Sequence, residues 1–248
     1  MLAKVARAIR NPTIIRRKLR WHRELLTKKR EIARAKKYFT ENKLGEVLGL
    51  GDANEFPPVV FDLVNLHREI RRRQSRYVLE FGVGFSTIVM CDALHKNAVE
   101  GRREGRLWVV DASKHWIENT CEKMPEHLKK YCEFTRSRAE VSLYNGELCH
   151  TFENLPDISP DLIYLDGPGG DDVEGDYKGL GFKTVPYKRT VVSADVLFYE
   201  STIAKGSRFL LIVDGRYNNV QFLKRNLKRK YIVKEFTELK YSTFELLE

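Results

Sequence analysis

The pattern that most constrains the fold begins at Tyr77, where short apolar runs start to alternate with segments of helical periodicity. The runs predict strands at 77–81, 107–111, 131–135, 162–166 and 209–214, with helices near 86–94, 116–117, 191–203 and 219–227. Strands joined through helices pair in parallel, because only a long crossover returns the chain to the same end of a sheet. The sequence therefore predicts an α/β protein with a doubly wound, mostly parallel sheet covered by helices on both faces.

Two segments depart from this alternation. The last two apolar runs, 231–236 and 243–247, are separated by only a few residues, so we expect them to pair antiparallel at one edge of the sheet. Asn145-Gly146 lies between apolar runs at 141–144 and 147–152, and this dipeptide favours a two-residue hairpin turn. A hairpin inserted after the third strand is therefore predicted.

The N-terminal segment differs from the rest of the chain in charge. Residues 1–44 carry 15 Lys/Arg and 3 Asp/Glu, a balance of +12, whereas the other 204 residues carry 29 and 31, a balance of −2. Residues 12–39 show helical periodicity, and the glycine- and proline-rich segment 44–58 follows as a linker or shaped loop. We therefore expect a basic helical extension at 1–55 and a second domain at 56–248, which begins with a helix over 59–73.

Two interpretations of the basic helix at 12–39 remain open. It packs its apolar residues on the domain or on a second copy of the chain, as in a homo-oligomer. Alternatively it lies on an anionic membrane surface or, less favoured, on nucleic acid, because cations gain from a negative surface. No run is long enough to cross a bilayer, and no secretory signal is recognisable. With four cysteines that form no CxxC pair, we expect reduced thiols and a cytoplasmic protein, either free or peripheral to the inner face of a membrane.

Carboxylates stand at the ends of four predicted strands, at Glu80, Asp111, Asp166 and Asp214. Doubly wound sheets bind ligands at the carboxyl ends of their strands, near the point where the strand order reverses. Burying a carboxylate there costs free energy unless a partner binds it. These four residues are therefore candidates for a binding site.

The turn after the first strand reads Glu80-Phe81-Gly82-Val83-Gly84-Phe85-Ser86-Thr87. Its two glycines let the backbone turn sharply and approach a ligand closely, and the two hydroxyls open the next helix. The turn lacks the lysine of a phosphate-binding loop and the third glycine of a dinucleotide fingerprint. The acid before it suits a ligand with a cationic end, and S-adenosylmethionine carries an ammonium and a sulfonium there.

The segment 78–87 resembles the first motif of class I S-adenosylmethionine-dependent methyltransferases, an acidic residue followed by Gly-x-Gly. Leu107-Trp108-Val109-Val110-Asp111 is similar to the second strand, and Asp161-Leu162-Ile163-Tyr164-Leu165-Asp166-Gly167-Pro168 is similar to the fourth. The resemblance covers about 75–248 and implies a Rossmann-like, seven-stranded sheet whose last strand is antiparallel. It implies a cofactor site at Glu80, Gly82, Gly84, Phe85, Ser86, Thr87, Asp111, Arg138 and Ala139. For Trp116 we favour a core position over contact with the adenine.

The same resemblance places Asp166 at the methyl-transfer site as the candidate catalytic residue. It could take a proton from an alcohol acceptor or, with Asp214 and Asn218 or Asn219, hold Mg²⁺. The long interval between the two acids departs from the metal-dependent pattern, so we do not favour a metal. The segment 167–181 contains six glycines, and we expect either a mobile cover over the substrate or a disordered surface loop.

The acceptor is the least constrained part of the prediction. Asp166-Gly167-Pro168-Gly169 departs from the turn of the base-methylating enzymes, and the acids of 171–176 disfavour a phosphate backbone. We therefore favour O-methylation of a small or glycan-like hydroxyl compound. An RNA- or protein-directed methyltransferase that uses the basic helix, and a non-catalytic protein that keeps the fold, remain as alternatives.

Overall fold

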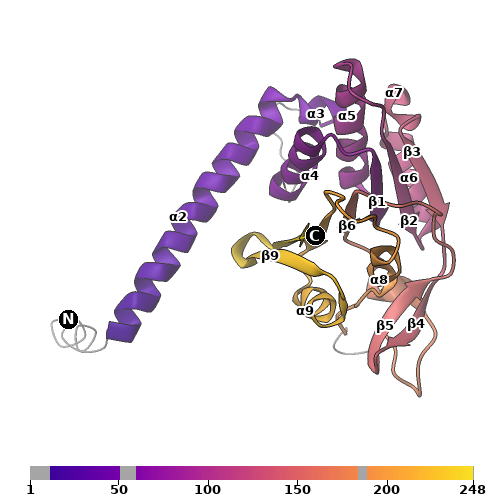
Figure 1. Ribbon diagram of the computed structural model, residues 1–248. Helices are drawn as coiled ribbons and strands as arrows, with labels where there is room; N and C mark the ends of the chain where they lie inside the picture. Colours follow the sequence, from indigo (N-terminus) through magenta and orange to yellow (C-terminus); the bar gives the residue numbers. More distant parts are fainter. Residues whose placement is uncertain (1–11, 51–59, 184–188, 248) are drawn as a thin grey trace.

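The computed structural model describes residues 12–50, 60–183 and 189–247, and a seven-stranded sheet forms its centre (Figure 1). The strand order is β3-β2-β1-β6-β8-β10-β9. The bounds are β1 (Tyr77–Phe81), β2 (Arg106–Asp111), β3 (Cys132–Arg136), β6 (Leu162–Leu165), β8 (Leu210–Asp214), β9 (Lys230–Phe236) and β10 (Tyr241–Leu247). Six of these seven strands run in one direction, and β10 lies antiparallel between β8 and β9. The doubly wound, seven-stranded prediction is confirmed, and the order reverses between β1 and β6.

Alternate residues of each central strand pack on opposite faces of the sheet. Val78 and Tyr164 belong to the core shared with α4 (Val60–Arg73) and α5 (Phe85–Val99). Leu79 and Leu165 belong to the core shared with α8 (Asp195–Glu200) and α9 (Tyr217–Asn226). Because both faces are covered by helices, these strands are largely apolar, with Glu80 of β1 as a buried exception. Two further helices, α6 (Lys114–Lys123) and α7 (Glu126–Lys129), follow β2.

The predicted hairpin is present as β4 (Ala139–Tyr144) and β5 (Glu147–Phe152). Asn145 and Gly146 both have positive φ, as a tight hairpin turn of this type requires. The pair gains a third strand, β7 (Val173–Glu174), which comes from the glycine-rich segment. A short 3-10 helix, η1 (Gly170–Asp172), and the buried Val173 tie the first part of the segment 167–181 to β4, and movement of this segment over a substrate stays a prediction.

The basic segment forms α2 (Pro12–Glu41), a single helix of 30 residues that projects away from the sheet in Figure 1. Its C-terminal part belongs to the domain, since Ala35 and Phe39 are buried in the core that α4 and α5 share. Leu44 and Leu48, in and after the short α3 (Leu44–Val47), are buried in the same core. The expected boundary near residue 55 therefore does not separate two packing units. The rest of the expected linker, 51–59, lies outside the described residues.

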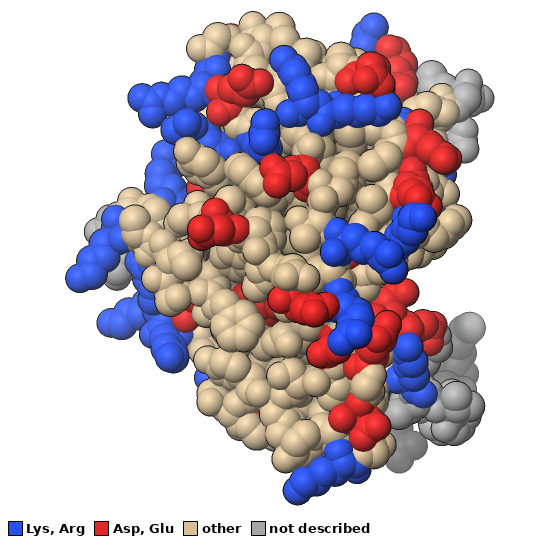
Figure 2. Space-filling view, turned by 90° about the vertical axis from the view of Figure 1, so that its right-hand side faces the viewer, with Lys and Arg blue, Asp and Glu red and all other residues tan. Residues whose placement is uncertain are grey.

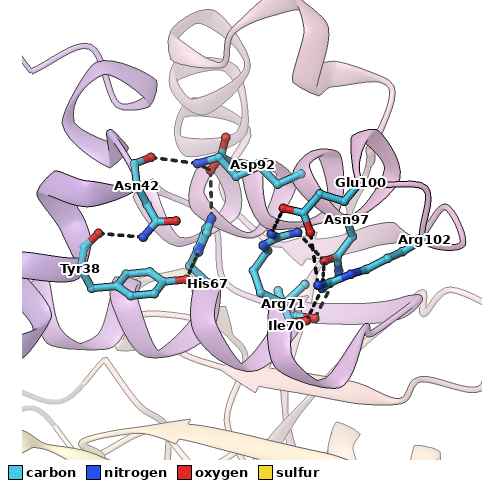
Figure 3. A network of polar contacts seen from close by, with 10 residues as sticks. Tyr38, Asn42, His67, Ile70, Arg71, Asp92, Asn97, Glu100 and Arg102 are labelled. Atoms are coloured by element: carbon cyan, nitrogen blue, oxygen red, sulfur yellow. Dashed lines mark hydrogen bonds and ion pairs between the residues drawn. The ribbon is translucent and has the colours of Figure 1, made fainter.

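A chain of buried polar contacts fixes this end of α2 (Figure 3). The Tyr38 hydroxyl lies 2.8 Å from His67 Nδ1, and His67 Nε2 lies 3.0 Å from Asp92 Oδ2. Lys96 Nζ lies 2.7 Å from the same Asp92 oxygen and donates to the Asn42 carbonyl at 2.8 Å. Burial alone would raise the pKa of Asp92, but the bonds from His67 and Lys96 outweigh burial and keep it low. The network therefore joins α2, α4 and α5 through a charged carboxylate.

Charge is mixed on the face shown in Figure 2, which is turned away from the side on which α2 projects. Basic and acidic side chains alternate there with uncharged ones, so this face carries no field of a single sign. In the described ranges, no helix combines the length and the apolar character that crossing a membrane requires.

Candidate functional site

A cavity of about 350 Å³ opens at the carboxyl ends of β1, β2 and β6, next to the point where the strand order reverses. Its walls come from the glycine turn after β1, the first turns of α5, Asp111, one face of α6, and the turn that begins with Asp166. This is the position at which open α/β sheets bind their ligands. The structure therefore brings Gly82, Gly84, Phe85, Asp111 and Asp166 of the predicted site together around one cavity.

The two glycines of the turn serve different purposes. Gly82 has φ +103°, and a Cβ at this position would lie 2.8 Å from the backbone nitrogen of Gly167, so the β1 and β6 turns touch only because no side chain intervenes. Gly84 also lines the cavity, but a Cβ there would meet no atom within 4 Å. Packing within the protein therefore does not require glycine at position 84, and the open space beside it is available to a ligand.

Glu80 lies beneath the turn and has no exposed surface. Its carboxylate accepts hydrogen bonds from the Ser86 hydroxyl and, at 2.6 Å, from the Thr87 hydroxyl. Thr87 Oγ1 in turn accepts from the backbone N–H of Gly84 at 3.1 Å. Burial raises the pKa of Glu80 to about 8, against the opposing effect of the two hydroxyls. Three of the predicted cofactor residues, Glu80, Ser86 and Thr87, therefore hold the shape of the turn and do not line the cavity.

Asp111 ends β2 and lines the cavity while remaining largely buried. Its Oδ1 accepts from the backbone N–H of Ser113 at 2.7 Å, just before α6 begins. Burial raises the pKa of Asp111 to about 6, although three backbone N–H groups near it act in the opposite direction. A carboxylate with several acceptor positions can cap the backbone and still bind the hydroxyls of a ligand.

Asp166 is half-buried at the end of β6, and its side chain shares a hydrogen bond with Asp214 at the end of β8. The Tyr164 hydroxyl also bonds to it, and Arg216 Nη2 lies 3.8 Å from its Oδ1. Arg216 further donates to the backbone carbonyls of Asp166 and, at 2.8 Å, of Pro168. Burial and the neighbouring Asp214 raise the pKa of Asp166 well above its ordinary value. Asp166 therefore holds a proton more tightly than an isolated aspartate would.

A third carboxyl near this pair was not anticipated from the sequence. Asp62, in the first turn of α4, is 5% exposed, and its Oδ1 has no hydrogen-bond partner. Burial, followed by the charges of Asp214 and Asp166, raises its pKa to about 8. Within 12–50, 60–183 and 189–247, no three His, Cys, Asp or Glu side chains group as a metal ion would need. Asn219, one of the two asparagines considered as metal ligands, is buried, and its Oδ1 accepts a hydrogen bond from the Ser193 N–H at 3.2 Å.

Two predicted residues lie away from the cavity. Arg138 is exposed and pairs with Glu140, and Ala139 is fully buried as the first residue of β4. Neither of them lines the cavity. The hairpin starts two residues after β3, so Ala139 packs within it and Arg138 lies exposed beside it, and their contact with a cofactor stays a prediction.

One face of α6 takes part in the site instead. Trp116, Asn119, Thr120 and Lys123 line the cavity at helical spacing. Trp116 is 53% exposed, which corrects its expected core position. Lys123 Nζ lies 5.8 Å from the centre of the Phe85 ring, at the start of α5. Residues at 116, 119, 120 and 123 share one side of a helix that follows Asp111, and this spacing could have indicated them from the sequence.

Comparisons with known proteins gave only distant structural likenesses. A scan of sequence-family models found no match, and neither did a search of curated proteins. An O-methyltransferase of tomaymycin synthesis from Streptomyces achromogenes, solved with S-adenosylmethionine, is 15% identical at a TM-score of 0.45, covering 88% of this chain and 89% of that chain. An O-methyltransferase from Bacillus cereus, solved with S-adenosylhomocysteine, is 13% identical at 0.45, covering 86% and 90%. A methyltransferase from Podospora anserina, also bound to S-adenosylhomocysteine, is 12% identical at 0.46, covering 90% and 96%. At TM-scores below 0.5, these likenesses are too weak to assign an activity.

Proposed function

We propose that this chain is an S-adenosylmethionine-dependent methyltransferase that methylates a hydroxyl group of a small or glycan-like acceptor. The observation that carries the proposal is the shared cavity at the point where the strand order reverses. There an unfilled glycine position, the buried carboxyl of Asp111 at the end of β2 and the half-buried carboxyl of Asp166 after β6 line one cavity. The order and chemistry of these three groups match the motifs that the sequence resembles.

The cavity suits this cofactor better than a nucleotide with a pyrophosphate. Its wall contains the carboxyls of Asp111, Asp166 and Asp172 and one cation, Lys123. Phosphates would be repelled by such a set, whereas a ligand with a sulfonium and an ammonium gains from it. Asp111 offers acceptors for the two ribose hydroxyls, and the rings of Phe85 and Trp116 offer flat apolar surfaces for an adenine.

The protein's contribution to the reaction follows from the groups around Asp166. S-adenosylmethionine, when bound, supplies an electrophilic methyl group on its sulfonium. Asp166 takes the proton of the acceptor hydroxyl, and Tyr164 and Arg216 hold its carboxylate in place. Asp214 shares that proton across the hydrogen bond between the two side chains. A raised pKa makes Asp166 a better match for a hydroxyl proton, and orientation of the acceptor provides most of the rate enhancement.

The proposal is tested first by binding and then by transfer. We expect S-adenosylmethionine and S-adenosylhomocysteine to bind in calorimetry, and labelled methyl groups to pass to a member of a panel of hydroxylated small molecules and glycans. Asp166→Asn should abolish transfer and retain binding of S-adenosylhomocysteine. Glu118→Gln, an exposed acid on α6 that does not line the cavity, serves as the matched control. Absence of binding of either compound, or full transfer by Asp166→Asn, would contradict the proposal.

Other outcomes separate the alternatives. Transfer to RNA or protein substrates that stops when residues 1–24 are removed would favour a macromolecular acceptor. Normal cofactor binding with no transfer to any acceptor in a cell extract, for the wild type and for Asp166→Asn alike, would favour a non-catalytic protein.

A further inference from the structure

The described part of α2 has two distinct faces. Ala35 and Phe39 are buried in the core that the helix shares with α4, and Leu25 and Ile32 on the same side of the helix are half-buried. The opposite face is exposed at every position that follows at spacings of three and four. Those positions are Leu26, Lys29, Arg30, Ala33, Lys36, Lys37 and Thr40. The apolar stripe of the helix is therefore used by the domain itself, and a cationic stripe is turned outward.

The helix is held as an arm of fixed direction. Its C-terminal end is fixed by the contacts of Tyr38 and Asn42 with α4 and α5, shown in Figure 3. From that point the helix passes η2 (Thr237–Leu239), which joins β9 to β10, and its N-terminal part extends away from the sheet (Figure 1). Thirty helical residues span about 45 Å, so the arm reaches well beyond the body.

The positive charge of the protein is concentrated on this arm. Residues 12–41 contain 11 Lys/Arg and 3 Asp/Glu, whereas residues 45–248 carry a balance of −2. Two of the three acids form ion pairs along the helix, Glu31 with Arg34 at 2.6 Å and Glu41 with Lys37 at 3.7 Å. The remaining cations still far outnumber the acids, so the arm attracts an anionic surface that the body does not.

We propose that the outward face of α2 docks on an anionic lipid bilayer. Each lysine or arginine near such a surface gains from its negative potential, and a straight arm can present its cations to a plane at the same time. Leu26, 44% exposed, lies within the cationic stripe and can enter the interface between headgroups and acyl chains. A nucleic acid backbone offers no comparable apolar interface for this leucine.

Flotation with lipid vesicles tests the proposal on the full chain. The arm variant combines Lys29→Glu, Arg30→Glu and Lys37→Glu on the outward face. The control variant makes the same change of charge on the body with Lys114→Glu, Lys129→Glu and Lys130→Glu, all partly exposed cations that pair with nearby acids. We expect wild type and control to float with vesicles of phosphatidylcholine and phosphatidylglycerol but not with phosphatidylcholine alone. The arm variant should bind about a hundredfold more weakly, because each cation contributes roughly fivefold.

Several results would overturn the proposal. The first is that the wild type does not float with anionic vesicles at low salt, and the second is that the arm and control variants lose vesicle binding equally. The third is tighter binding of the wild type to single- or double-stranded RNA than to anionic vesicles. The fourth is a wild-type dimer in sedimentation that is absent in the arm variant. The cofactor assay separates this inference from the proposed function. S-adenosylhomocysteine should bind equally to the wild type and the arm variant, whatever the vesicles show.

Discussion

The two glycines of the turn after β1 allow one prediction to be worked out in detail. In Gly82→Ala, the new Cβ would lie 2.8 Å from the Gly167 nitrogen on a backbone with φ +103°. Residues held at a positive φ cost about 1–3 kcal/mol, and a contact this short adds a similar amount. In Gly84→Ala, the Cβ meets nothing within 4 Å, and φ is extended at 165°. Alanine is a poorer helix N-cap than glycine, which lowers the free energy of unfolding by about 0.5–1 kcal/mol. Alanine also restricts the unfolded chain, which raises the free energy of unfolding by a similar amount, so the two effects offset each other.

The two variants should therefore separate stability from binding. Gly82→Ala is expected to lower the free energy of unfolding by about 2–5 kcal/mol in urea titrations. Gly84→Ala should change it by less than about 1 kcal/mol. Gly84→Ala should nevertheless weaken the binding of S-adenosylhomocysteine in calorimetry by at least about tenfold, because the methyl group occupies space reserved for the ligand. Unchanged affinity in a folded Gly84→Ala would refute the interpretation that this glycine admits a cofactor.

Three further predictions concern the buried polar groups. Glu80 has a pKa of about 8 in the folded protein against 4.5 ordinarily, so the folded state holds this proton more tightly and loses stability as pH rises between those values. We therefore expect the melting temperature of Glu80→Gln, measured relative to that of the wild type, to rise as the pH increases from about 5 to 8. A difference in melting temperature that does not change with pH would contradict the raised pKa of Glu80. Asp214→Asn removes a like charge beside Asp166 and should shift the acid limb of the pH–rate profile to lower pH, whereas an unmoved limb would show that the two carboxyls do not interact. Tyr38→Phe should cost about 1 kcal/mol and speed proteolytic release of α2, with protection equal to wild type as the opposing result.

Much of the fold follows from local patterns in the sequence. The strands at Tyr77–Phe81 and Leu162–Leu165 coincide with largely apolar runs, because strands buried on both faces carry few charged residues; Glu80 is the one charged residue within these two strands. The same rule located Asp111 and Asp166 at the edge where the cavity opens. The hairpin at Asn145-Gly146 was equally predictable, since its turn has a narrow chemical requirement.

The remaining features depend on contacts between distant segments. No local pattern indicates that Val173 and Glu174 add a strand beside Ala139, or that Asp62 approaches Asp166 and Asp214. The burial of Glu80 beneath its own turn results from the hydroxyls at 86 and 87, which compete with any ligand for its oxygens.

The basic helix shows a similar limit. Charge composition separated 1–44 from the rest of the chain, but the packing of Ala35 and Phe39 against α4 joins the end of this segment to the main core. The charge composition of a segment indicates how much of it is exposed to water. Whether the segment belongs to a domain depends on the few apolar residues that pack in the core.

The most direct test of the account is a crystal structure of the chain grown with S-adenosylhomocysteine. We expect the ligand in the cavity, with its ribose hydroxyls within hydrogen-bond distance of Asp111, its chain passing over Gly84, and its sulfur turned toward Asp166. Density for the ligand elsewhere, or an orientation that leaves Asp111 without a ribose contact, would contradict the assignment of this cavity as a methyl-donor site.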